Sequence, residues 1–122
     1  MKDHKELDVW KKGIDLVVES YRHSGMFPKD ELFGLTSQMR RAAVSIPSNI
    51  AEGAARNTSK EFVQFLHVAL GSAAELETQF IIAKKLGYLE EIDGVLIRLA
   101  AVQQMLNGLI RHYRNKGTTG VR

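Results

Sequence analysis

The chain has 122 residues, of which 44% are hydrophobic and 25% charged, values typical of one soluble globular domain and not of a disordered chain. It contains no cysteine, which excludes disulfide bonds, thiol nucleophiles and thiolate zinc sites. No apolar run is long enough to cross a membrane, and the charged start lacks an export signal, so we expect a cytoplasmic protein. The net charge of +3 is compatible with nucleic acid but does not require it.

Apolar residues recur at the helical period along the chain, and no stretch alternates as a strand would. The first predicted helix covers about residues 5–24 and ends at Gly25, a residue suited to a helix C-terminus. Its predicted buried stripe consists of Leu7, Trp10, Ile14, Val17, Val18 and Tyr21. Pro28 then precedes the acidic first turn, Asp30 and Glu31, of a second predicted helix over about residues 30–55.

The second predicted helix contains a proline in the stretch "SIPSNIAEG". A proline inside a helix removes one backbone hydrogen bond and costs ~3 kcal/mol or more. The apolar stripe nevertheless continues in phase across Pro47, from Ile46 to Ile50, which predicts a continuous helix kinked at Pro47. The stripe consists of Leu32, Leu35, Met39, Ala43, Ile46 and Ile50. The polar residues expected to bond the freed backbone groups are Ser45, Ser48 and Asn49.

The third predicted helix covers about residues 59–86, with Thr58 and Glu61 as a capping box and Lys84 and Lys85 before Gly87 at its end. Its stripe consists of Phe62, Phe65, Leu66, Ala69, Ala73, Leu76, Phe80 and Ala83. The fourth covers about residues 90–114, with the stripe Ile92, Val95, Leu96, Leu99, Val102, Leu106, Leu109, Ile110 and Tyr113. Residues 115–122 have no stripe, and we expect a loose tail there.

Four amphipathic helices joined by short connections predict an all-α fold, an up-down-up-down antiparallel four-helix bundle, as one domain over residues 1–122. Helices of this size are roughly 30–40 Å long.

Two of these helices carry small or apolar residues on the side away from the predicted core. The second helix has Ser37, Val44, Ser48, Ala51 and Ala55 there, interrupted by Arg40. The fourth has Gly94, Ile97, Ala101, Met105 and Gly108. Such faces predict contacts with another subunit, although scattered exposed apolar residues are also normal in a monomer. The residues assigned to assembly and to the kink are Gln38, Arg41, Val44, Ser45, Pro47, Ser48, Asn49, Ala51 and Glu52.

The stretch "FGLTSQMRRAAVSIPSNIAEGAAR", preceded by "MFPKDE" and followed by "EFVQFLHVALGSAAELE", resembles a small bacterial protein family encoded in intervening sequences of 23S ribosomal RNA genes. The likeness spans about residues 7–113. It implies a four-helix bundle, a ring-like homopentamer and no established enzymatic role. That family is similar to the accessory variability protein of diversity-generating retroelements. This second likeness implies, as partners, RNA or DNA and, where the gene lies in a retroelement, a reverse transcriptase.

The sequence lacks the spacings expected of catalytic or metal-binding sites. Its four histidines are widely separated, without a His-Glu-x-x-His pair or the Glu-x-x-His pairs of di-iron bundles. Ser72 lies within a predicted helix and outside any nucleophile elbow, and "KGTTG" lacks the spacing of a phosphate loop. We therefore expect no enzymatic activity, no metal and no cofactor.

Basic residues leave two functions open. The candidates for contact with nucleic-acid phosphates are Arg40, Lys84, Lys85, Arg111, Arg114 and Lys116. Guanidinium groups suit phosphate, and a ring would repeat each weak contact. The alternative is a protein-interaction or assembly scaffold without nucleic acid, because basic residues usually form a solvated face. We expect Arg41 instead to pair with a carboxylate such as Glu52, within the chain or across subunits.

Overall fold

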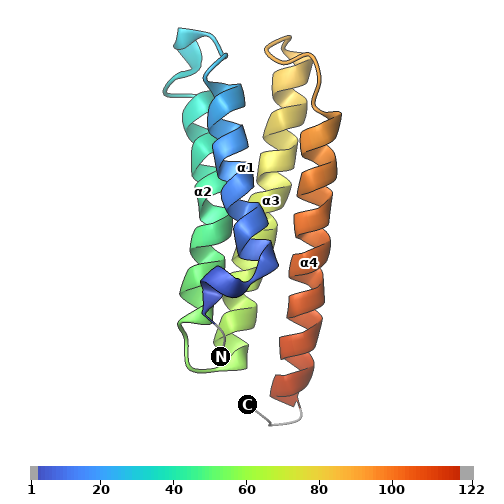
Figure 1. Cartoon of the computed structure of the whole chain (residues 1–122). Coiled ribbons are helices and arrows are strands. Elements are labelled where there is room, and N and C mark those ends of the chain that lie inside the picture. Colours follow the sequence, from blue (N-terminus) through green and yellow to red (C-terminus); the bar gives the residue numbers. More distant parts are fainter. Residues whose placement is uncertain (1–2, 119–122) are drawn as a thin grey trace.

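The computed structural model describes residues 3–118, and the regular secondary structure of this part of the chain consists of helices joined by short connections, with no strand (Figure 1). Two short 3₁₀ helices, η1 and η2, accompany four α-helices, which confirms the predicted four-helix fold. The elements are η1 (His4–Glu6), α1 (Asp8–Ser24), η2 (Lys29–Glu31), α2 (Leu35–Ala54), α3 (Ser59–Lys85) and α4 (Asp93–Thr118). None of the described helices combines the length and apolar character that a membrane crossing requires.

The four α-helices form a bundle in which each helix runs opposite to the one before it (Figure 1). Helices that follow one another in sequence pack side by side, and α4 returns to contact α1. In the described bundle α2 therefore neighbours α1 and α3, and it lies diagonally across from α4. The outer faces of α2 and α4 consequently lie on opposite sides of the molecule.

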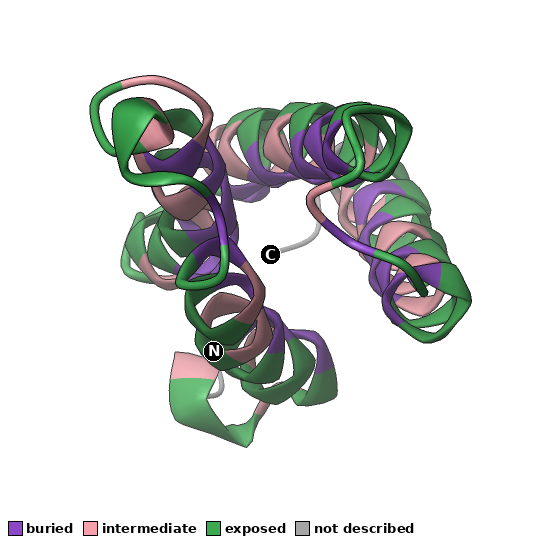
Figure 2. Ribbon diagram, turned by 90° about the horizontal axis from the view of Figure 1, so that it is seen from above, coloured by how far each residue is buried: buried purple, intermediate pink, exposed green. Residues whose placement is uncertain are grey.

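The hydrophobic core lies between the four helices, and the buried faces point inward (Figure 2). The predicted stripe of α3 is buried except for the half-buried Phe65, and most of the predicted stripe of α4 is buried as well. These two predictions are confirmed. The largest fully buried side chains are Leu16, Met39, Ile46, Ile50, Phe62, Leu66, Leu76, Phe80, Val95, Leu99, Val102 and Leu106.

The predicted buried stripe of α1 is wrong. Ile14, Val18 and Tyr21 are exposed, whereas Leu7, Trp10 and Val17 only border the core. The face of α1 that is buried consists of Val9, Gly13, Leu16, Ser20 and Ser24. Three of these residues are small, and small residues let helix backbones approach closely. Ile14, Val18 and Tyr21 consequently point away from the core, and part of the apolar surface of α1 faces outward.

Pro47 lies inside α2 without interrupting it, so the predicted continuity is confirmed and the kink stays a prediction. The proline ring is buried against α1. A Cβ atom added to Gly13 would lie 3.5 Å from atoms of Ile46 and Pro47, an ordinary packing distance. The side-chain amide of Asn49 donates to the Ser45 carbonyl at 2.8 Å. It does not bond the Ala43 carbonyl, which the proline frees.

The second predicted helix is divided in the structure. Asp30 and Glu31 belong to η2, and α2 begins only at Leu35, after Gly34 with φ −113° and ψ −114°. Leu32, predicted to be buried, is exposed in the segment between the two. A Glu31 carboxylate oxygen accepts a hydrogen bond from the Leu35 amide at 3.1 Å, so Glu31 caps α2 from outside the helix.

The ends of α3 and α4 follow local capping chemistry. The Glu61 amide donates to Thr58 Oγ1 at 3.1 Å as predicted, but the Glu61 carboxylate accepts from that same hydroxyl and not from the Thr58 amide. Gly87, with φ +82°, follows α3 as the predicted C-terminal residue. α4 begins at Asp93 instead of Glu90, and it continues through residues 115–118, which were predicted to belong to a loose tail. Extending a formed helix adds one hydrogen bond per residue fixed, which favours continuation. Residues 119–122 of that tail lie outside the described residues.

Candidate interaction surface

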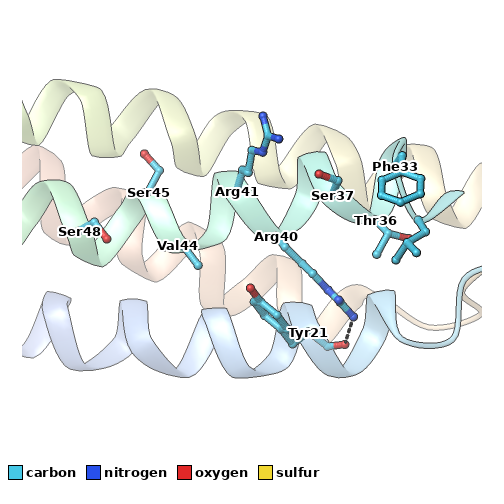
Figure 3. Close-up of a pocket in the computed structure, with 10 residues that line it drawn as sticks. Tyr21, Phe33, Thr36, Ser37, Arg40, Arg41, Val44, Ser45 and Ser48 are labelled. Carbon is cyan, nitrogen blue, oxygen red and sulfur yellow. Dashed lines mark hydrogen bonds between the residues drawn. The ribbon is translucent and has the colours of Figure 1, made fainter.

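A groove of about 660 Å³ runs along the outer side of α2, between the helix and the end of α1 (Figure 3). Its lining is apolar and hydroxyl-rich, with two arginines at its rim, and it contains no His, Asp or Glu. The lining residues are Tyr21, Leu32, Phe33, Thr36, Ser37, Arg40, Arg41, Val44, Ser45 and Ser48. Most of them belong to the stretch of α2 for which the sequence predicted an assembly face.

Large apolar side chains are exposed around this groove. Phe33 is 93% exposed, Leu32 51%, Tyr21 44% and Val44 40%. Contiguous exposed apolar patches of this kind mark contact sites more often than isolated exposed residues do. Sequence reasoning assigned Tyr21 and Leu32 to the core and did not single out Phe33. The signal available in the sequence was Gly34, which separates Phe33 from the helix that follows.

The segment that carries Phe33 is held by Glu31. The carboxylate accepts hydrogen bonds from the Tyr88 hydroxyl at 2.7 Å and from the Leu35 amide. The Tyr88 hydrogen bond, followed by that of the Leu35 amide, lowers the pKa of Glu31, and the same bond raises the pKa of Tyr88. Because Tyr88 lies between α3 and α4, this contact ties the start of α2 to the opposite half of the bundle. Glu31, two residues before Phe33, is therefore anchored to both halves of the bundle.

The two arginines at the groove differ in their contacts. Arg40 Nε donates to Ser24 Oγ at 2.9 Å. Its guanidinium lies 4.5 Å from the centre of the Tyr21 ring, and Figure 3 shows the two side chains. Its Nη2 also donates to the Tyr21 carbonyl at 3.5 Å, near the C-terminus of α1, where a cation is favourable. Arg40, a predicted phosphate contact, thus joins α1 to α2. Arg41 is exposed and forms no ion pair or hydrogen bond within residues 3–118.

Part of the predicted assembly strip is used inside the chain. Ser45 Oγ lies 2.8 Å from Ser72 Oγ of α3, and the Asn49 amide donates to Ser45 Oγ at 2.8 Å. This polar network joins α2 to α3, and Ser72 was not predicted to take part in it. Glu52 pairs with Arg56 one turn later at 3.1 Å, so the predicted Arg41–Glu52 pair does not form within the chain.

The remaining residues of the strip lie at or near the surface. Gln38, Val44 and Ser48 are exposed, and Ala51 is half-buried. Together with Arg41 they leave the outer side of α2 open, whereas Pro47 is buried on its inner side. The structure therefore separates the predicted assembly residues into an outer set and a set that holds the bundle together.

The predicted phosphate-binding residues are not brought together in one patch. Lys84 and Lys85 end α3, while Arg111, Arg114 and Lys116 lie in the last turns of α4 at the opposite end of the bundle (Figure 1). Arg114 Nη2 lies 3.0 Å from His67 Nε2 of α3, and Lys116 Nζ lies 5.5 Å from the centre of the Tyr113 ring. The last turns of α4 thus form a basic end that also includes a histidine.

Over residues 3–118, no three His, Asp or Glu side chains are grouped so that they could hold a metal ion.

Comparisons with known proteins agree with the motif found in the sequence. A family model described as 23S rRNA-intervening sequence protein matches residues 5–108. The match covers the groove and all of its lining residues. A search of curated proteins finds no match.

Proposed function

The chain belongs to the 23S rRNA-intervening sequence protein family, and from that premise we propose that it is a non-catalytic structural protein that associates with further copies of itself. The observation that supports this proposal is the groove on α2, with Phe33 93% exposed at its rim. Removing one such side chain from water contributes about 1.5–3 kcal/mol, and an assembly gains this at every contact. The lining offers no general base for catalysis.

A ring of five copies is the assembly that the family resemblance implies. Contacts between two different surfaces close into rings when the rotation between neighbours permits. A closed ring of five would have a mass of about 68 kDa, five times the 13.7 kDa of one chain.

Light scattering coupled to gel filtration tests self-association. We expect the wild-type chain to elute with the mass of several subunits at micromolar concentration, and Phe33→Ser to shift toward the mass of one chain. Val68→Ser is the matched control, because Val68 is 51% exposed on α3, away from the groove, and should leave the mass unchanged. A wild-type mass near 14 kDa at high protein concentration would refute the proposal.

The basic end of α4 supports a second candidate function, non-sequence-specific contact with RNA or DNA phosphates. Arg111 and Arg114 lie one turn apart, and His67 of α3 adds a further nitrogen beside Arg114. An assembly would repeat this end and add weak contacts together.

Titration of labelled RNA and DNA at two salt concentrations tests this candidate. Binding should weaken steeply with salt: the logarithm of the binding constant should fall with the logarithm of the salt concentration, with a slope of roughly 0.7–0.9 per phosphate contact. Binding should also fall when Arg111 and Arg114 are both replaced by Glu. Reversal of Lys84 and Lys85, at the opposite end, is the matched control for an equal change in net charge. No binding at micromolar protein would reject nucleic-acid contact and leave self-association untouched.

A further inference from the structure

We propose that the outer face of α4 of one copy docks into the α2 groove of the next copy. This inference rests on the proposed self-association and names the two surfaces that would meet.

The outer face of α4 is almost free of charge. Between residues 94 and 110 the only charged side chain is Arg98. Its Nε and Nη2 atoms both donate hydrogen bonds to the Glu19 carboxylate of α1, with Nε at 2.9 Å. The exposed residues of this stretch include Gly94, Ile97, Ala100 and Gln104, and Ile97 is 71% exposed. A helix face that points into water normally carries Lys and Glu. This face therefore has the composition of a covered surface.

The outer side of α1 combines charged residues with the exposed apolar residues Ile14 and Val18. Lys11, Lys12, Asp15 and Arg22 are all exposed along it, within twelve residues. No comparable run of charges exists on α4 before Arg111. The two helices therefore differ in charge: both expose apolar residues, and between residues 94 and 110 α4 lacks the accompanying run of charges that α1 carries.

The dimensions of the two surfaces agree. The groove follows α2 from Thr36 to Ser48, about 18 Å at the helical rise. The uncharged face of α4 from Gly94 to Asn107 is about 20 Å long by the same rise. Ile97 is the protruding apolar residue of this face, and Val44 is an apolar wall of the groove.

Charge is also complementary between the two surfaces. Arg41 stands at the rim of the groove, and Asp93 is exposed at the start of α4, one turn before Ile97. Neither forms an ion pair with another of the residues that the structure describes. Docking of α4 along the groove would let these two charges meet.

The positions of the two surfaces favour a contact between unlike faces. Because α2 and α4 are diagonal in the bundle, each copy presents its groove on one side and its α4 face on the other. A symmetric groove-to-groove contact would bring together two concave surfaces and two Arg41 side chains of like charge. The unlike contact avoids both and can repeat from copy to copy.

Disulfide trapping tests the pairing, because the natural chain has no cysteine. Val44→Cys chains are mixed with Ile97→Cys chains that carry a mass tag, and the mixture is oxidised at a concentration where the wild type associates. We expect the tagged–untagged disulfide to exceed both same-variant disulfides. A dominant Val44→Cys pair, or no disulfide in an associated sample, overturns the pairing while self-association stands. A wild type that stays monomeric at every concentration up to the highest attainable one contradicts the proposed function itself.

Charged substitutions give a second, independent test, in which the mass of the assembly is measured by light scattering coupled to gel filtration. Ile97→Lys should weaken association about ten-fold, as expected for loss of a central apolar contact, with unchanged helicity by circular dichroism. Val68→Lys, on α3, should not weaken it. Arg41→Glu and Asp93→Arg should each weaken association, and the two together in one chain should restore it. Additive losses in the double variant would show that these residues do not meet.

Discussion

The two faces of α2 have similar chemistry and different environments. Between residues 42 and 51 the helix contains no charged residue on either face. On the inner face Ala43, Ile46 and Ile50 are fully buried, while on the outer face Val44 is 40% exposed and Ser48 is also exposed. The absence of charge therefore does not show which face belongs to the core, whereas the apolar stripe of Ala43, Ile46 and Ile50 does. The inner face stabilises the fold, and the outer face remains available for another molecule.

The largest expected effect comes from the inner face. Ile50→Ala deletes a fully buried side chain and should lower the free energy of unfolding by about 2–5 kcal/mol, through lost burial and the cavity left behind. Val44→Ala, earlier in the helix and on the outer face, should change it by less than about 0.5 kcal/mol in dilute protein. Chemical denaturation followed by circular dichroism measures both values. Equal losses would show that the two faces are not different in the single chain.

A smaller effect is expected at Gly53, where α2 packs closely against α3. A Cβ atom there would lie 2.7 Å from Phe65 Cβ and 2.9 Å from Phe62 Cδ1, closer than packed atoms allow. Gly53→Ala should therefore destabilise the fold by about 1–3 kcal/mol. Gly71→Ala should instead stabilise the fold, because its Cβ would meet nothing within 4 Å. Alanine also favours a helix over glycine by up to ~1 kcal/mol. The melting temperatures of the two variants test this prediction, and stabilisation by Gly53→Ala would contradict the close packing at Gly53.

An acid-sensitive effect is expected at the start of α2. The hydrogen bonds from Tyr88 and Leu35 lower the pKa of Glu31 below its ordinary value of 4.5. The stabilisation that they provide is therefore complete above the ordinary carboxyl pKa and is lost as the pH falls through the lower folded value.

Unfolding measured from neutral pH down to pH 3 tests this contact. Glu31→Gln should remove the corresponding part of the acid dependence, and Tyr88→Phe should reduce it by removing the hydroxyl donor. An unchanged acid dependence in both variants would mean that the contact does not contribute to stability.

The fold could be predicted from the sequence wherever large apolar residues form the buried face. α3 is the clearest case, because Phe62, Leu66, Leu76 and Phe80 recur at the helical period and all are buried. α1 could not be predicted in this way, because its buried face uses Gly13, Ser20 and Ser24, and a hydropathy pattern favours apolar residues over small ones. Which face of α1 is buried depends on how closely α2 approaches, and that is a tertiary property.

The candidate surface could be predicted only in part. The uncharged outer side of α2 was visible in the sequence, whereas the exposure of Phe33 depends on the break at Gly34 and on the contact between Glu31 and Tyr88. Arg40 looked like a free cation because its partner Ser24 lies sixteen residues away on another helix. Pairings of this kind require the register between helices, which the pattern of one helix does not contain.

The measurement that most directly tests the two-faced character of α2 is the melting temperature as a function of protein concentration. If copies associate through the outer face, association stabilises the folded state by mass action. The wild-type melting temperature should then rise with concentration, whereas Val44→Lys should melt at a temperature that does not depend on concentration and that matches dilute wild type. A wild-type melting temperature that stays constant over a hundred-fold range and equals that of Val44→Lys would contradict the account.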